Sequence, residues 1–249
     1  MRFRRLNSLG LSLALLGCLS STSPSPPLIG EGRPVLFVGN SYLYWRDIPG
    51  IVQSMADSAG GDKLAVMSVV GPDMALIDHW NVGTVQEELG RHAFEWVVLQ
   101  QGPSSVEVNR DTLRLAAKLF ADEMAKVGNA KPALFSAWPG ASRRQDFPRA
   151  IESYTLAASD VSGIFLPVAS GWLAAWERDA NLGLYSDALH PSTEGAYLSA
   201  LVIYARLLNK SPVGLPSTLR LASGAVVTIA PAVAATLQQA AAAVASPPP

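Results

Sequence analysis

The chain has 249 residues, of which 49% are apolar, and its 19 Lys and Arg residues nearly balance its 20 Asp and Glu residues, for a formal charge of −1. A chain of this size buries enough apolar surface for one full hydrophobic core, so we expect a single globular domain. Nucleic-acid binding needs clustered Lys and Arg, and the sequence has no such cluster beyond its first residues. A small molecule is therefore the expected partner.

Residues 1–17 have the layout of an export signal. Arg2, Arg4 and Arg5 precede the stretch LNSLGLSLALLG, which is apolar but too short to span a bilayer. The single cysteine, Cys18, forms no internal disulfide and ends the sequence LLGC, which resembles a bacterial lipobox. We expect export to the bacterial periplasm or outer membrane as a lipoprotein, with a lipid on Cys18 as its membrane contact. The alternative is a freely secreted protein.

Residues 18–33 are rich in Pro and Ser and are predicted to form a flexible linker. The folded domain is expected over 34–245, followed by a disordered tail at 246–249. Within the domain, short β-rich runs alternate with helix-length segments that carry apolar residues at helical spacing. Strands are expected at 34–39, 64–71, 95–102, 131–138 and 163–169, and helices at 47–59, 74–90, 109–128 and 147–159.

This alternation predicts an α/β fold. Parallel strands need crossover connections, and helices supply them, so the pattern indicates a three-layer α/β/α sandwich around a five-stranded parallel sheet. Another helix is expected after Ser192, whose hydroxyl can cap it. The last part of the chain predicts a short hairpin around Ser223 and Gly224 and then an alanine-rich helix.

The ends of the expected strands carry polar residues. Ligands of open parallel sheets bind beyond the carboxyl ends of the strands. These ends hold Asn40 and Ser41, Gly71, Gln100 and Gln101, and Trp138, in chain order. A serine, a glycine N–H and a side-chain amide are the components of an acyl-transfer site. Taken alone, Gly-Asn-Ser is also a common turn or helix cap.

A serine hydroxyl needs a base to become a nucleophile, and the sequence offers three histidines. His190 stands in DALHP, three residues after Asp187. At this spacing the carboxylate can accept from one imidazole nitrogen while the other faces a serine. His190 and Asp187 are therefore the candidate base and its orienting carboxylate.

The quoted motifs resemble those of the SGNH or GDSL hydrolases. GNSY follows the first strand, Gly71 the second and an amide residue the third, and DALHP lies near the end, so that the resemblance covers residues 34–208 in the family's order. It implies a flavodoxin-like sheet of five strands. It also implies that Ser41 is the nucleophile of a triad with Asp187 and His190. The implied oxyanion hole consists of the Ser41 and Gly71 N–H groups and the side chain of Gln101 or, as the alternative, Gln100.

Two blocks depart from the family pattern. Asn40 replaces an aspartate but keeps a side chain that can hydrogen-bond the turn. The third block, LQQGPSS, has no asparagine and is similar to sialate O-acetylesterase-like members. The resemblance therefore favours a serine esterase acting on short acyl groups, such as the acetyl groups of a carbohydrate. A lipase or thioesterase for longer chains and a non-catalytic binding lipoprotein are the alternatives.

Three residues are candidates for contact with substrate. They are Asn40, His79 in LIDHW, and Trp138, although a histidine or tryptophan at these places is also compatible with a purely structural role. No pair of His, Cys or clustered carboxylates has the spacing of metal ligands, so we expect no metal and no other cofactor. We expect the protein to act as a monomer.

Overall fold

The computed structural model describes residues 26–128 and 130–245. The predicted signal at 1–17, the lipidation of Cys18 and the tail at 246–249 lie outside the described residues. The described end of the predicted linker is partly packed on the domain: Ile29 forms an antiparallel bridge with Val66, and the first strand begins at Arg33. Of the helices in the described part, none is both long and apolar enough to cross a bilayer.

A parallel sheet of five strands forms the centre of the molecule, in the order β2-β1-β3-β4-β5. The strands are β1 (Arg33–Gly39), β2 (Leu64–Val70), β3 (Trp96–Leu99), β4 (Lys131–Phe135) and β5 (Ile164–Leu166). β1, β3 and β4 are the inner strands, with β3 in the middle of the sheet, and the run Val35–Val38 of β1 is fully buried. Continuous burial fits a strand that is covered by helices on both faces.

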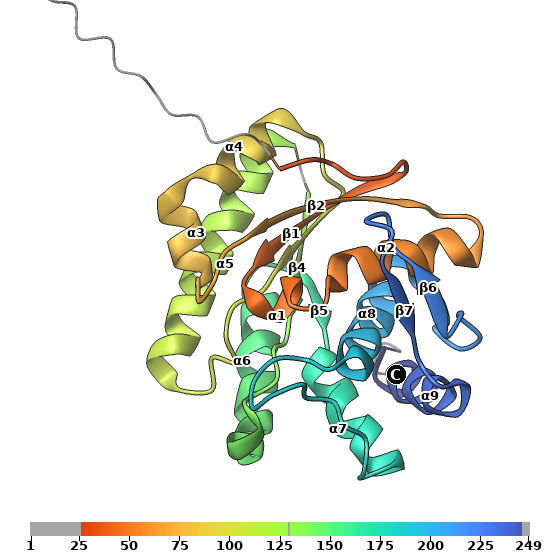
Figure 1. Cartoon of the computed structure of the whole chain (residues 1–249). Coiled ribbons are helices and arrows are strands. Elements are labelled where there is room, and N and C mark those ends of the chain that lie inside the picture. Colours follow the sequence, from red (N-terminus) through yellow and green to blue (C-terminus); the bar gives the residue numbers. More distant parts are fainter. Residues whose placement is uncertain (1–25, 129, 246–249) are drawn as a thin grey trace, which may run out of the picture.

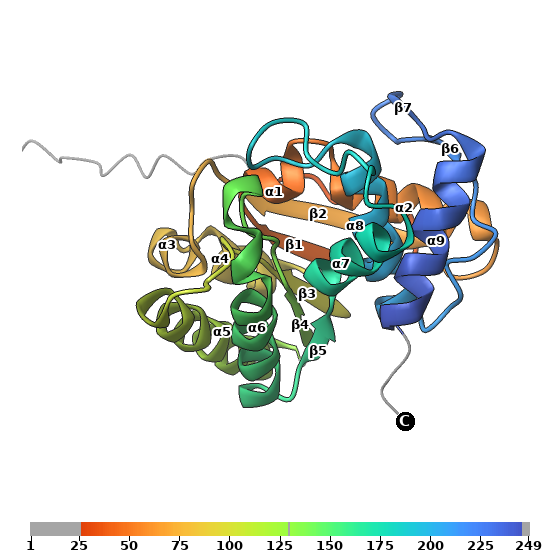
Figure 2. The same cartoon turned by 90° about the horizontal axis from the view of Figure 1, so that it is seen from below.

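Helices cover both faces of the sheet (Figures 1 and 2), which confirms the predicted three-layer α/β fold. One layer consists of α3 (Leu76–Val82), α4 (Thr84–Arg91), α5 (Glu107–Val127) and α6 (Phe147–Asp160). The other consists of α2 (Ile48–Ala59), α7 (Val168–Arg178) and α8 (Thr193–Leu208), with α9 (Pro231–Ala245) packed outside α7 and α8. A hairpin of β6 (Thr218–Arg220) and β7 (Val226–Thr228) lies beside α2.

Several expected elements differ from the structure. The strands expected at 95–102 and 131–138 are shorter, Trp96–Leu99 and Lys131–Phe135. The helix expected at 74–90 is two helices, α3 and α4, because Gly83 between them adopts a left-handed conformation with φ 89°. The strand expected at 163–169 ends at Leu166, and α7 starts at Val168, directly after Pro167. A short apolar run is compatible with a buried strand or a buried helix, and the proline marks the break.

Candidate active site

Ser41 lies at a sharp turn beyond the carboxyl end of β1. It is the first residue of α1 (Ser41–Tyr44), and the Asn40 side chain caps this helix by accepting from the Tyr42 N–H at 3.2 Å. The turn also requires Gly39, since a Cβ there would lie 2.2 Å from Gln100 Oε1. The strand end, the cap and the short helix together hold Ser41 at the edge of the sheet, where the residue is 8% exposed.

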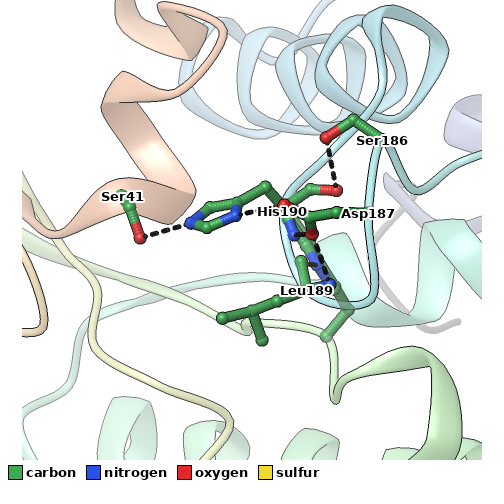
Figure 3. A network of polar contacts seen from close by, with 6 residues as sticks. Ser41, Ser186, Asp187, Leu189 and His190 are labelled. Carbon is green, nitrogen blue, oxygen red and sulfur yellow. Dashed lines mark hydrogen bonds and ion pairs between the residues drawn. The ribbon is translucent and has the colours of Figure 1, made fainter.

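Three side chains that we predicted to form a triad meet at this edge (Figure 3). His190 Nε2 lies 3.0 Å from Ser41 Oγ, and His190 Nδ1 lies 2.8 Å from Asp187 Oδ2. Because a carboxylate only accepts hydrogen bonds, Nδ1 carries the hydrogen and Nε2 offers its lone pair to the serine hydroxyl. Ser41 and His190, which meet here, are separated by 149 positions in the chain.

Asp187 is held by the loop as well as by the imidazole. Its Oδ1 accepts from the backbone N–H groups of Leu189 and His190, each at 2.6 Å. The hydrogen bond from the His190 side chain, followed by those two backbone donors, lowers the pKa of Asp187 to about 2. The carboxylate is therefore ionised throughout the neutral pH range, although its side chain is 47% exposed.

Two hydrogen bonds to backbone carbonyl oxygens fix the loop that carries His190. Trp138 is fully buried, and its indole N–H donates to the Leu189 carbonyl oxygen at 3.0 Å. The Ala141 N–H donates to the Ala188 carbonyl oxygen at 2.8 Å. The predicted contact of Trp138 with substrate therefore needs correction: its ring stacks on Trp172 in the core and anchors the loop instead of lining the cavity.

His79 was likewise predicted to line the substrate site, and the structure places it in the core. It is 3% exposed, and its Nε2 lies 2.8 Å from the Gly39 carbonyl oxygen, so that Nε2 carries the hydrogen. Burial lowers the pKa of His79 below its ordinary value. The same carbonyl accepts from the Gly71 N–H at 3.1 Å. His79 thus fixes the end of β1, two residues before the serine.

The burial of a neutral His79 predicts a stability that depends on pH. The unfolded chain takes up the proton near the ordinary value of 6.5 and the folded protein only at lower pH, so unfolding binds a proton and stability falls as pH drops below about 6.5. We expect the free energy of unfolding of the wild type to fall relative to His79→Gln by at most about 1.4 kcal/mol per pH unit. Urea denaturation of both proteins between about pH 7.5 and about pH 5.5 measures this. A pH-independent difference would contradict a buried neutral imidazole.

The two glutamines after β3 point to different neighbours. Gln101 Oε1 accepts from the Leu76 N–H at 3.1 Å, and its Nε2 donates to Ser104 Oγ at 2.9 Å and to the Asn109 carbonyl at 3.3 Å. The backbone donor fixes which end of the amide is oxygen. Both amide hydrogens of Gln101 are therefore engaged, and a role as oxyanion donor requires one of them to be released.

Gln100 is fully buried behind the turn. Its Oε1 accepts from the Asn40 N–H at 3.0 Å, and its Nε2 donates to Asn40 Oδ1 at 3.1 Å and to the Gln101 carbonyl at 2.6 Å. Asn40 Nδ2 donates to the Met74 carbonyl at 3.0 Å. The hydrogen bonds between Asn40 and Gln100 thus join the ends of β1 and β3 next to Ser41.

A cavity of about 360 Å³ is lined by Asn40 and Tyr42, the chain neighbours of Ser41. Its polar wall consists of Asn40, Asp73, Gln101, Ser104, Asn109 and Thr112, and its apolar wall includes Tyr42, Met74 and Leu189. A second hollow of about 250 Å³ shares Tyr42, Ser104, Asn109 and Leu189 with it. Asp73 and Ser104 both have φ 55°, a conformation that non-glycine residues adopt at a cost and that is common at functional sites. Among residues 26–128 and 130–245, no cluster of three or more His, Cys, Asp or Glu could hold a metal ion.

No family model and no curated protein sequence matches the chain. Solved structures do. A lipase/acylhydrolase from Enterococcus faecalis is 14% identical with a TM-score of 0.55, covering 71% of this chain and 96% of its own. The acetyl xylan esterase AlAXEase is 17% identical with a TM-score of 0.57, covering 69% and 98%. The fold is that of these lipases and esterases. The acetylxylan esterase Axe2 from Geobacillus stearothermophilus has it too, at 14% identity and a TM-score of 0.51 over 76% and 98% of the two chains.

Proposed function

We propose that the protein is a serine ester hydrolase that removes short acyl groups, with acetyl esters of carbohydrates as its substrate class. One observation carries the proposal. The contacts from Ser41 Oγ through His190 to Asp187, at 3.0 and 2.8 Å, have the lengths and the direction that an activated serine needs. This is also the arrangement that the resemblance to SGNH or GDSL hydrolases implies. A cavity lined by Asn40, Tyr42 and Leu189, which neighbour these residues in the chain, offers room for a substrate.

The reaction runs in two halves. His190 Nε2 takes the proton of the Ser41 hydroxyl as Oγ attacks the ester carbonyl carbon, and the same proton then goes to the leaving alcohol oxygen as the ester C–O bond breaks. The acyl group now sits on Ser41. A water molecule gives a proton to Nε2 and attacks the acyl carbon. Nε2 then returns the proton to Ser41 Oγ as the acyl C–Oγ bond breaks, which releases the acid and restores the serine. Asp187 holds the imidazole and stabilises its positive charge in both halves.

The oxyanion that forms in each half needs hydrogen-bond donors. The Ser41 N–H is suited to this, because the first residue of a helix has no carbonyl within the helix to which it can donate. We keep Gly71 and Gln101 as further proposed donors. Each is engaged in the free protein, to Gly39 and to the loop respectively, so that the substrate carbonyl would have to compete for their hydrogens.

Replacing Gln101 by alanine tests its share in the hole. If its amide stabilises the oxyanion, kcat for a nitrophenyl ester should fall about 100-fold with little change in KM. Gln100→Ala is the comparison variant, because Gln100 is the alternative donor and also bonds Asn40 beside Ser41. A Gln101→Ala enzyme with wild-type kcat would assign Gln101 to the support of the loop alone.

The walls of the cavity favour a polar substrate with a short acyl group. Asp73, Ser104, Asn109 and Thr112 offer donors and acceptors of the kind that bind sugar hydroxyls, and the likeness of the block LQQGPSS to sialate O-acetylesterase-like members points the same way. Two of the solved structures with this fold are described as acetylxylan esterases. The apolar residues Tyr42, Met74 and Leu189 leave a lipase or thioesterase for longer chains as the second candidate.

A substrate series tests the proposal. The purified protein is assayed on nitrophenyl acetate, butyrate and octanoate and on an acetylated xylo-oligosaccharide. We expect kcat/KM to be highest for acetate, to fall with acyl length, and to be at least as high for the acetylated sugar as for nitrophenyl acetate. A kcat/KM that is highest for octanoate would favour the second candidate, a lipase or thioesterase. No hydrolysis of any ester would favour a non-catalytic binding protein.

A further inference from the structure

We infer that Trp45 is a positioning residue of the proposed triad: its indole face stabilises the protonated imidazole of His190 during proton transfer. This inference rests on the proposed function. The rings of Trp45 and His190 are stacked, with their centroids 4.1 Å apart and their planes inclined by 15°. Neither a sequence motif nor the resemblance to SGNH or GDSL hydrolases implies a role for Trp45.

The position of the indole is tied to that of the serine. Trp45 directly follows α1, and its N–H donates to the Ser41 carbonyl oxygen at 3.0 Å, one helical turn away. The same short helix therefore sets both the hydroxyl that His190 deprotonates and the ring that covers His190. Trp45 is 47% exposed, so its side chain contributes much less to the core than a buried tryptophan does. A stabilising role in the core does not account for it.

The surroundings of His190 leave one of its faces to Trp45. Its Nδ1 meets Asp187 and its Nε2 meets Ser41. Asp187 is the ionised group in contact with the ring, and it lies at the ring edge. The hydroxyls of Tyr42 and Tyr185 carry no charge over the pH range of the test, and burial raises the pKa of both further, to about 12 for Tyr185. Among the described residues, the indole ring of Trp45 is the group stacked on the face of the His190 imidazole.

An aromatic face attracts a cation more than a neutral ring, because its quadrupole places negative charge above the plane. His190 is neutral before the reaction and positive once it has taken the Ser41 proton. The stack is therefore stronger in the transition state than in the free enzyme, and only such a difference accelerates the chemical step. It also holds the imidazole plane in the orientation that faces Ser41.

The test compares Trp45→Leu, Trp45→Phe and the wild type on nitrophenyl acetate across pH. For Trp45→Leu we expect kcat to fall about threefold to tenfold with KM changed less than about twofold. Since the positive imidazole loses a stabilising partner, it gives up its proton at lower pH. The acid limb of the kcat/KM profile should therefore move down by about half to one pH unit. Trp45→Phe, which restores an aromatic face, should lie between the two.

Tyr44→Leu is the matched control. Tyr44 is 40% exposed on the same helix and has no ring contact with His190 among the described residues, so kcat and the acid limb should stay as in the wild type. An unmoved acid limb in Trp45→Leu, or the same changes in Tyr44→Leu, would overturn the inference. NMR titration of the His190 imidazole in Trp45→Leu and in the wild type measures the same effect on its protonation in the absence of substrate. A wild type with no esterase activity and no reaction with a fluorophosphonate would instead overturn the proposed function, and this inference with it.

Discussion

Replacing Ser41 by alanine is expected to lower kcat on nitrophenyl acetate by about four to six orders of magnitude. The hydroxyl is the atom that forms the acyl bond, and without it His190 has no nucleophile to activate. The fold should persist, because Ser41 Oγ makes its described hydrogen bond to His190 alone and alanine is a good helix former. Activity and thermal denaturation, measured on the same preparations, separate the two effects.

Ser186 provides the control for this substitution. It belongs to the same polar network (Figure 3), and its Oγ lies 3.3 Å from the His190 carbonyl oxygen, away from the imidazole. Ser186→Ala should keep kcat within about twofold of the wild type. A fluorophosphonate should label the wild type and Ser186→Ala, and should not label Ser41→Ala, since only an activated serine reacts. A Ser41→Ala protein that is still labelled would place the nucleophile elsewhere.

The sheet could be predicted from sequence because its signal is local and repeated. Each inner strand is a short apolar run, as in Val35–Val38, and the helices between the strands carry their own periodicity. The meeting of Ser41 with His190 then follows from topology, since the carboxyl ends of parallel strands share one edge. The contact between Asp187 and His190 could be predicted because the two residues are only three positions apart in one loop.

The direction of a side chain at a strand end could not be predicted in the same way. Trp138 follows β4 and His79 lies in α3, and both are buried near the correct edge, where Trp138 donates to the Leu189 carbonyl oxygen and His79 to the Gly39 carbonyl oxygen. Both bonds go to backbone atoms, and a backbone acceptor leaves no mark in the sequence. The stack of Trp45 on His190 was missed for a related reason: an aromatic residue four positions after a serine shows its role only when the distant loop is in place.

The contacts of Asp187 lead to a second large effect. Its Oδ1 accepts two backbone N–H groups at 2.6 Å, while its Oδ2 accepts the His190 Nδ1–H. In Asp187→Asn the amide has one oxygen and one NH₂ group. The oxygen must stay at the two N–H donors, because an NH₂ group there would face hydrogens with hydrogens. The NH₂ group therefore faces Nδ1 of the imidazole.

That arrangement reverses the tautomer of His190. With a donor opposite Nδ1, the imidazole proton moves to Nε2, where it points at Ser41 and cannot accept the hydroxyl proton. We expect kcat to fall by about three to four orders of magnitude with little loss of stability, because both loop hydrogen bonds survive. Asp187 is 47% exposed, so solvent weakens its charge effect, but the tautomer effect needs no burial. Kinetics and the NMR shifts of the two ring nitrogens test this together. A variant within about tenfold of wild-type kcat would mean that the loop N–H groups do not fix the amide, and that orientation of the imidazole rests on Trp45 and Ser41 instead.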